Sequence, residues 1–310
     1  MNIAYYEENN YHTEIMGTFL YYFREKGIMV TVYNNMDRSE YVQYFKKICN
    51  FELKKIDEFK KFHHTHNYII LGTSYSIEHI RDMYNHIKYK IIPVCHLKEN
   101  INDNEKCIIL SPINLINKNC NYIFPIHNFM NNCTEKKANI FSLIGRFKDD
   151  NRDTQDLINT ITKYHDLNYE IHIYSRHKKF IPKKIFELQS AYPNRLKIFL
   201  KIKMDMLEKR INNSKFLITL VKNNSCYHND RLSGILPLAF NYNIPLIMDK
   251  SLNNIYKFES SIQYNNSLAE VIEYVTNING IEYTNLVNKV ALEKKNIIEN
   301  NNNTLGILLK

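Results

Sequence analysis

Two arginines follow one strand-like segment of this chain at a spacing suited to phosphate. The apolar run 140-IFSLIG-145 ends in Gly145, Arg146 follows directly, and Arg152 comes six residues after Arg146, at the approach to a helix. Glycine lets the backbone turn tightly, and a planar guanidinium matches phosphate oxygens. Two guanidinium groups near a helix N-terminus would form a diphosphate site. The alternative interpretation is a strand end followed by a solvated charged loop.

A Ser-Gly step suggests a second phosphate-binding arrangement. Ser233 and Gly234 stand where a helix begins, after the strand-like run 215–221 and a polar loop. Backbone N–H groups at a helix start attract anions. Pro237 lies in the first turn of this apolar helix, where proline is tolerated. The alternative is a tightly packed helix–strand unit with a glycine at its turn.

Histidines offer acid–base or hydrogen-bonding chemistry at three places. His96 ends the apolar run 89-YKIIPVCH-96, where it could contact a sugar hydroxyl or transfer a proton, although a lone histidine is more often structural. His12 follows the first predicted strand, and Glu14 beside it fits the start of a helix. No acid or cysteine joins 63-HHTH-66 at helical spacing, so this segment is expected to be solvated rather than metal-binding.

Several function classes lose support from what the sequence lacks. It contains no GxGxxG, Walker A, GxSxG or HExxH motif, which argues against dehydrogenases, NTPases, serine hydrolases and zinc proteases. Its six cysteines form no CxxC pair, so they are expected to be reduced thiols rather than zinc ligands. It has neither a signal-peptide pattern nor an apolar run near the roughly 18 residues of a membrane span. We therefore expect a soluble, cytoplasmic protein.

The net charge of +9 favours an anionic partner, either nucleic acid or a phosphorylated small molecule. The charges are dispersed along the chain, whereas a nucleic-acid interface needs Lys and Arg on one face, so nucleic acid is not the expected partner. Abundant Asn, Ile, Lys and Tyr without Trp are typical of an AT-rich genome, such as that of a giant virus or a protist. That bias says nothing about activity.

Strand-like and helix-like segments alternate along the whole chain. In the first part, strands are predicted at 2–7, 28–34, 68–74, 89–96, 107–111 and 122–127, with helices at 12–27, 39–50 and 76–88. After a polar linker at 128–139, strands are predicted at 140–145, 169–175, 196–202, 215–221, 244–249 and 261–264, with helices at 154–165, 181–192, 204–213, 232–242, 267–277 and 281–300. This alternation predicts an α/β protein with two Rossmann-like domains, each built on a parallel sheet, facing a central cleft. Ligands of such sheets bind at the carboxyl ends of the strands.

The second half resembles the donor-binding domain of GT-B glycosyltransferases, nearest to family 4 of the retaining enzymes. The resemblance rests on 144-IGRF-147, 169-YEIHIYS-175, 200-LKIKMDMLEKRINNSKFLITL-220 and 230-DRLSGILPLAFNYNIPLI-247. Less specifically, 11-YHTEIMGTFLYYFREKGIMVTVYN-34 and 90-KIIPVCH-96 look like the acceptor domain. In overall pattern the chain is also similar to compact glycosyltransferases encoded by giant viruses.

The resemblance implies the GT-B fold. Residues 1–133 would form the acceptor domain and residues 134–310 the donor domain, with the C-terminal helix packing back across the cleft. The implied reaction moves a sugar from a nucleotide-diphosphate sugar to a glycan, lipid or protein acceptor. It would need no metal or other cofactor, and the resemblance favours retention of the anomeric configuration. The implied location is the cytoplasm, or a virus factory if the chain is viral.

The resemblance also assigns roles to individual residues. Gly145 and Arg146 would hold the donor diphosphate, and Arg152 lies one residue away from the family's basic position. Ser233 and Gly234 would offer backbone amides to the phosphate. Catalytic roles near the transferred sugar would fall to Asp230, at the first carboxylate of the family's paired-glutamate motif, and to His96. His12 would contact the acceptor or the sugar.

Two departures from the family pattern leave alternatives open. Leu238 stands where the second carboxylate of the pair would bind the donor ribose. The segment 7-EENNYH-12 replaces the glycine-rich loop after the first strand. A catalytically degenerate GT-B-like binding protein is therefore the main alternative, and a nucleic-acid-binding protein is the less favoured one.

Overall fold

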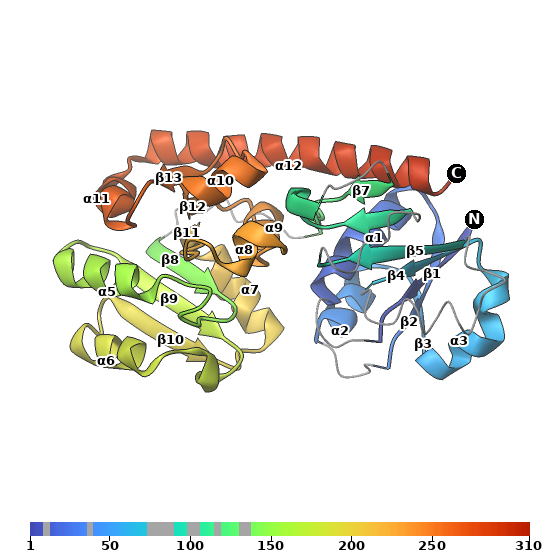
Figure 1. The fold of residues 1–310 in the computed structure, drawn as a ribbon, viewed down its shortest axis with the longest axis horizontal. Coiled ribbons are helices and arrows are strands. Elements are labelled where there is room, and N and C mark those ends of the chain that lie inside the picture. Colours follow the sequence, from blue (N-terminus) through green and yellow to red (C-terminus); the bar gives the residue numbers. More distant parts are fainter. Residues whose placement is uncertain (9–12, 36–39, 73–89, 98–105, 115–118, 130–137) are drawn as a thin grey trace. The chain divides into compact units, whose positions relative to one another are not determined.

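The computed structural model describes residues 1–8, 13–35, 40–72, 90–97, 106–114, 119–129 and 138–310 (Figure 1). The chain divides into two compact units, Met1–Phe129 with Ile297–Lys310, and Met130–Asn296. The predicted helix 76–88, His12 and most of the predicted linker lie outside the described residues. Each unit is built on its own parallel sheet, so each is described by itself.

The first unit contains a seven-stranded parallel sheet in the order β3-β2-β1-β4-β5-β6-β7. Its strands are β1 (Asn2–Tyr6), β2 (Met29–Tyr33), β3 (Glu52–Lys54), β4 (Tyr68–Leu71), β5 (Ile91–Cys95), β6 (Cys107–Ile109) and β7 (Cys120–Tyr122). The described α-helices that begin in this unit are α1 (Met16–Glu25), α2 (Glu40–Ile48) and α3 (Ile56–Phe62). The strand order reverses between β1 and β4, as in a Rossmann fold.

Helix α1 shows how the sequence specifies this unit. Phe19 and Phe23 are fully buried one helical turn apart, which is the spacing of an amphipathic helix. The helix ends at Glu25, just before the predicted end at Gly27, because Gly27 has a φ of +63° and its N–H and that of Ile28 bond back to the last turn. Only glycine adopts this left-handed conformation without strain.

The second unit contains a six-stranded parallel sheet in the order β10-β9-β8-β11-β12-β13. Its strands are β8 (Ala138–Ile144), β9 (Glu170–Ser175), β10 (Leu196–Leu200), β11 (Ser214–Ile218), β12 (Leu246–Asp249) and β13 (Ile262–Tyr264). Its helices are α5 (Thr154–Lys163), α6 (Lys183–Ala191), α7 (Met204–Asn212), α8 (Cys226–Asn229), α9 (Ile235–Asn241), α10 (Lys250–Tyr256) and α11 (Ala269–Asn277). The strand order reverses between β8 and β11.

Apolar strands form the core of the second unit. β11 is buried along its whole length, as expected for a parallel strand covered on both faces. Phe141 and Tyr169 stack with ring centroids 5.8 Å apart, and Phe141 meets Phe216 edge-on at 5.6 Å. The predicted α/β architecture with two parallel sheets is confirmed.

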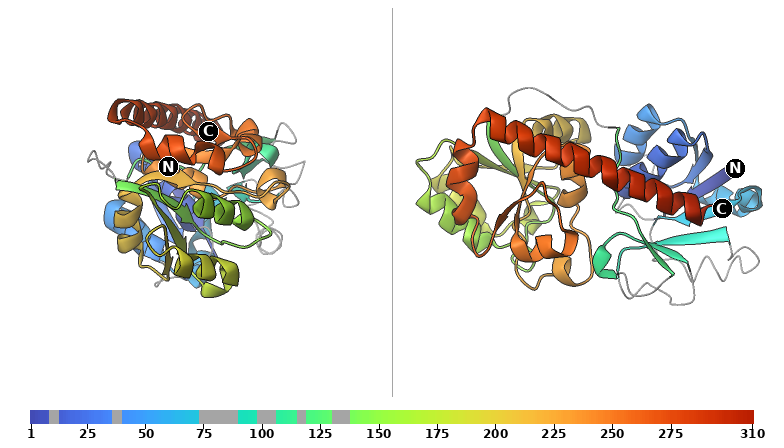
Figure 2. Two further views of the ribbon diagram at one scale, coloured as in Figure 1. Left: turned by 90° about the vertical axis from the view of Figure 1, so that its left-hand side faces the viewer. Right: turned by 90° about the horizontal axis from the view of Figure 1, so that it is seen from above.

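The last helix, α12 (Gly280–Leu308), is continuous over 29 residues (Figure 2). Up to Asn296 it belongs to the second unit, where the Glu293 carboxylate accepts the Ser260 hydroxyl and the Glu259 N–H. From residue 297 it belongs to the first unit, where the Asn301 side chain bonds both backbone groups of Phe124.

Some local predictions were wrong. The segment 122–127 was expected to be a strand, but β7 ends at Tyr122. His66 was expected to be solvated with its neighbours, but it is 2% exposed and its Nε2 lies 2.9 Å from the Tyr33 hydroxyl. The short elements β3, α3, α8 and α10 were not predicted. These elements span three to seven residues, too few to show a clear periodicity.

Candidate functional site

The candidate site lies at the carboxyl edge of the second sheet, where β8 and β11 are neighbours. Ligands of open parallel sheets bind at such a reversal of strand order. Gly145 and Arg146 follow β8, and residues 219–221 follow β11. The structure therefore places the two arginine candidates, Arg146 and Arg152, at this reversal.

The loop after β8 begins with a glycine that the backbone requires. Gly145 has a φ of +108°, and its N–H bonds the carbonyl of Tyr174 at 3.0 Å. Arg146 is exposed, and its guanidinium carbon lies 5.1 Å from the centre of the Phe180 ring. Arg146 is thus accessible to a ligand, and an aromatic face orients its guanidinium.

Arg152 lies deeper in the same loop and is only 3% exposed. Its backbone forms an antiparallel bridge with Val221, which fixes the loop against the end of β11. One guanidinium nitrogen donates to the Thr219 carbonyl, and Nε donates to the Arg146 carbonyl at 3.5 Å. The Tyr227 ring centre lies 5.3 Å from the guanidinium carbon.

Arg152 is a buried charge to which the described residues offer no carboxylate. Burial lowers the pKa of Arg152 from its ordinary value. No carboxylate within the described part of the chain forms an ion pair with it. A buried charge is costly unless an opposite charge accompanies it. The counter-charge for Arg152 is therefore expected from a ligand.

Helix α8 ties the loop after β11 to the loop after β8. Cys226 Sγ donates to Asn151 Oδ1 at 3.1 Å, one residue before Arg152. Asp230 is the C-cap directly after α8, and its carboxylate accepts two bonds from the neighbouring Arg231, at 2.8 and 3.2 Å. The structure thus brings the predicted Asp230 onto a segment that packs against the arginine loop, already paired with a cation.

Ser233 and Gly234 lie directly before α9, as predicted. Ser233 is 1% exposed, and among the described residues its hydroxyl has no hydrogen-bond partner. Gly234 has open space on the side where a Cβ would stand. Leu238 lies half-buried on α9, where it supplies no carboxylate. That the Ser233 and Gly234 amides bind phosphate stays a prediction.

A hydrogen-bonded cluster at the carboxyl end of β12 was not predicted. His228 Nε2 lies 2.8 Å from Ser251 Oγ, and this hydroxyl donates to Asp249 Oδ1 at 2.5 Å. Burial raises the pKa of Asp249, but hydrogen bonds from His228, Ser251 and the Leu252 N–H outweigh burial and lower it overall. The sequence signal was an aspartate at a strand end that caps α10.

This cluster does not have the geometry of a Ser-His-Asp triad. In a triad the aspartate orients the histidine through the nitrogen that does not face the serine. Here Asp249 Oδ1 lies 3.6 Å from Nε2, the nitrogen that already faces Ser251. Nδ1 faces the Ser225 hydroxyl at 3.4 Å instead. The cluster therefore joins α8 to α10 rather than activating a nucleophile.

The first unit has two polar residues of interest at its own carboxyl edge. His96 follows β5 directly, where the sequence predicted it, and is half-buried. Glu7 follows β1 and is 1% exposed, so it is a buried carboxylate that sequence reasoning missed. At Gly72 a Cβ would collide with the side chains of Glu7 and Tyr5, so any other residue there would require these side chains to shift. The third histidine candidate, His12, lies outside the described residues.

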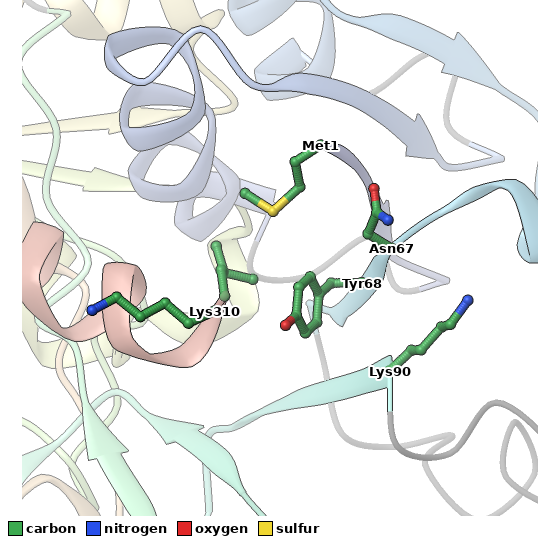
Figure 3. A pocket seen from close by; sticks show the side chains of 6 residues that line it. Met1, Asn67, Tyr68, Lys90 and Lys310 are labelled. Carbon is green, nitrogen blue, oxygen red and sulfur yellow. The ribbon is translucent and has the colours of Figure 1, made fainter.

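A pocket of about 470 Å³ opens elsewhere on the first unit (Figure 3). Its lining includes Met1, Asn67, Tyr68 and Lys90, which lie at the amino ends of β1, β4 and β5. Ligands of parallel sheets bind at the opposite edge, so we assign no role to this pocket.

Neither a metal centre nor a membrane span is found in the part of the chain that the structure describes. No three His, Cys, Asp or Glu side chains there gather in a way that could hold a metal ion. None of the described helices is both long and apolar enough to cross a membrane.

Comparison with known proteins identifies the fold. No protein-family model and no curated protein matches the chain. Among solved structures, HepE of Anabaena in complex with UDP and glucose has a TM-score of 0.72 at 9% identity, covering 99% of each chain. A glycosyltransferase from Rickettsia africae has a TM-score of 0.66 at 13% identity, covering 99% of this chain and 95% of its own.

The chain has the GT-B fold. The sucrose-phosphate synthase of Thermosynechococcus elongatus agrees, with a TM-score of 0.66 at 11% identity over 99% of this chain and 98% of its own. At such identities the GT-B likeness concerns the fold alone, and the site must be argued from this chain's own residues.

Proposed function

We propose that this chain is a glycosyltransferase that uses a nucleotide-diphosphate sugar as donor. The observation that carries the proposal is Arg152, a buried guanidinium without a carboxylate partner among the described residues, at the strand-order reversal of the second sheet. A diphosphate would supply the missing negative charge. HepE, whose structure is known with UDP-glucose, supports this class of donor.

The two arginines would act on the leaving group. Negative charge builds up on the nucleoside diphosphate as the glycosidic bond breaks. Arg146 and Arg152 stabilise that charge, and one such donor in a water-excluded site is worth about 2.7–4 kcal/mol. Arg152 is held by the Thr219 and Arg146 carbonyls before the ligand arrives, so its positioning costs little during the reaction.

The remaining roles follow from the resemblance in sequence. The Ser233 and Gly234 amides add donors to the diphosphate, and Asp230 contacts the transferred sugar. His96 contacts the sugar or the acceptor from the first unit, and His12 serves the acceptor side. We infer that the reaction retains the anomeric configuration, which NMR of the sugar released by slow donor hydrolysis would test.

We further infer that no metal is needed, because two guanidinium groups neutralise the diphosphate. After incubation with EDTA and desalting, donor turnover should stay within about twofold of that of the untreated protein, since each arginine already supplies a full positive charge. A loss of turnover that Mg²⁺ or Mn²⁺ restores would contradict metal independence while leaving the donor class intact.

The direct test is ligand-induced stabilisation of the purified chain. UDP, GDP, ADP, CMP and their common sugar conjugates are screened by thermal shift, with Arg146→Ala beside the wild type. We expect one nucleotide family to raise Tm and the shift to vanish in Arg146→Ala. Lys163→Ala, at an exposed position on α5, is the control and should keep the shift. If no nucleotide raises Tm, the proposal fails.

One observation favours a second function, nucleotide binding without transfer. Leu238 cannot accept a hydrogen bond from a ribose hydroxyl, and no carboxylate replaces it on α9. The two functions are separated by incubating the chain with the donor that stabilises it. Release of free nucleotide, as the sugar passes to water, supports the transferase, and binding without any release supports the degenerate protein.

A further inference from the structure

Three cations converge on one aromatic ring beside the candidate donor site. Arg146, Lys148 and Lys179 lie 5.1, 5.5 and 5.5 Å from the centre of the Phe180 ring. None of the three forms an ion pair with a carboxylate that the structure describes. Like charges gathered around one ring repel one another, and a bound anion would relieve the repulsion.

The positive charge continues along the neighbouring strand ends. Residues 171–204 contain nine Lys and Arg residues but one acid, Glu187. Two of the nine, Arg195 and Lys197, lie at the amino end of β10. Two more, Lys183 and Lys184 on α6, form ion pairs with Glu187 and Asp149, respectively. The remaining five are exposed, and we call them the basic edge: Arg176, Lys178, Lys179, Lys201 and Lys203.

The fold, rather than the sequence, brings these five side chains together. β9 and β10 are parallel neighbours, and their last residues, Ser175 and Leu200, are partners in register. The Lys201 N–H bonds the Ser175 carbonyl at 3.1 Å, so the loops that follow the two strands start side by side. Adjacent strands lie about 4.8 Å apart, so the basic edge adjoins the loop of Arg146 on one sheet edge.

The basic edge holds more charge than the proposed donor requires. Under the proposed function, Arg146 and Arg152 would already match the negative charge of the donor diphosphate. No described acid pairs with the five cations of the basic edge, so they remain available. Their surplus points to a second anionic ligand beside the donor, and the acceptor is the second ligand of a transferase.

The side-chain types indicate the class of that ligand. Single-stranded nucleic acids are bound by stacking bases on free aromatic faces. In this region the Phe180 ring is already contacted by three cations. Four of the five residues of the basic edge are lysines, which act as point charges on long stems rather than as forks for phosphate. Spaced single charges of this kind fit a chain of sugars with one acidic group on each.

We propose that the basic edge binds an anionic oligosaccharide, whose carboxylate or sulfate groups pair with the lysines, as the acceptor. This proposal rests on the proposed glycosyltransferase function. It predicts that an acidic oligosaccharide binds the full chain through these residues, whether or not a sugar nucleotide is present.

The test uses a fluorescently labelled hexagalacturonate and fluorescence anisotropy on the full chain. The variant K178Q/K179Q/K201Q/K203Q removes four charges from the basic edge. The control K163Q/K250Q/K289Q/K295Q removes four charges from exposed positions elsewhere on the second unit. We expect hexagalacturonate to bind the wild type and the control alike, and the basic-edge variant at least about 10-fold more weakly. A neutral maltohexaose should not bind.

Three outcomes would overturn the proposal. One is absence of hexagalacturonate binding, and another is equal loss in the two variants, which would mean that net charge alone matters. The third is binding of a single-stranded DNA 12-mer, or of phosphatidylserine vesicles, that is tighter than binding of hexagalacturonate. The exposed Leu200 and Met206 would be consistent with a membrane surface as the ligand. The nucleotide thermal shift of each variant is measured in parallel, so failure of the donor proposal shows separately.

Discussion

The guanidinium of Arg152 donates a hydrogen bond to the backbone carbonyl of Thr219, across the line where the strand order of the second sheet reverses. The bond joins the loop after β8 to the end of β11. A carbonyl oxygen carries only a partial negative charge, so this bond orients the arginine without neutralising it. The fold thus holds a full positive charge in a buried position before any ligand binds.

Replacing this arginine should separate stability from ligand binding. Arg152→Met removes a buried charge and keeps most of the side-chain volume, so we expect Tm of the ligand-free chain to stay the same or rise. The same change should abolish nucleotide-induced stabilisation, because the positive charge proposed to bind the diphosphate is lost. Thermal shift with and without the nucleotide measures both effects.

Arg195→Met is the matched control. Arg195 donates to the carbonyls of His165 and Tyr169 at 2.6 and 3.3 Å, far along the sheet from the candidate site, at the amino end of β10. Its loss should lower Tm but leave nucleotide stabilisation intact. If Arg152→Met instead lowers Tm by as much as the control and still binds nucleotide, Arg152 is a structural residue only.

The place of a candidate residue in the fold could be predicted from the sequence where it depended on a strand end. Arg146 follows a long apolar strand, so its place at the carboxyl edge followed from βαβ topology. The burial of Arg152 could not be predicted in this way, because it depends on Thr219, which follows β11, and on Tyr227 of α8, both far along the chain. The basic edge was missed for the same reason, since its residues gather only through the pairing of β9 with β10.

Asp230 offers a test of catalysis as distinct from binding. Its carboxylate is neutralised by Arg231 and lies on the segment that packs against the arginine loop. Asp230→Asn keeps the shape and should leave nucleotide stabilisation unchanged within about 1 °C, while donor turnover falls at least about 100-fold, the scale of a lost acid–base or charge contact. Turnover is measured as nucleotide release. Turnover within twofold of wild type would remove Asp230 from the proposed mechanism.

His66 should make the first unit sensitive to acid. Burial lowers its pKa to about 4, against about 6.5 when unfolded. The unfolded chain therefore binds the proton first as pH falls below 6.5. Stability from this group is complete above pH 6.5 and decreases by roughly 1.4 kcal/mol per pH unit at most, down to pH 4.

The variant His66→Gln isolates this contribution. Glutamine can still form a hydrogen bond with the Tyr33 hydroxyl but does not titrate. The free energy of unfolding of the variant, measured with urea, should therefore fall less between pH 6.5 and 4 than that of the wild type. His165→Gln, at an exposed histidine, should follow the wild type. Identical pH dependence in all three proteins would show that His66 is protonated equally well when folded.

Lys294 should destabilise the second unit at neutral pH. It is 3% exposed on α12, its Nζ donates to the Asn241 carbonyl at 3.2 Å, and burial lowers its pKa to about 8. Below pH 8 the ammonium is charged in both states and its burial is costly. Between pH 8 and about 10.5 the unfolded chain binds more protons, so stability of the wild type rises with pH.

Lys294→Met should therefore raise the free energy of unfolding at pH 7 by about 1–3 kcal/mol, since a buried ammonium is replaced by an apolar chain of similar length. The gain should shrink toward zero by pH 10.5, where the wild-type lysine is neutral. Lys295→Met, at the exposed neighbouring position, controls for added hydrophobicity and should change little at either pH. If Lys294→Met destabilises the chain at pH 7, the bond to the Asn241 carbonyl outweighs the cost of burying the charge.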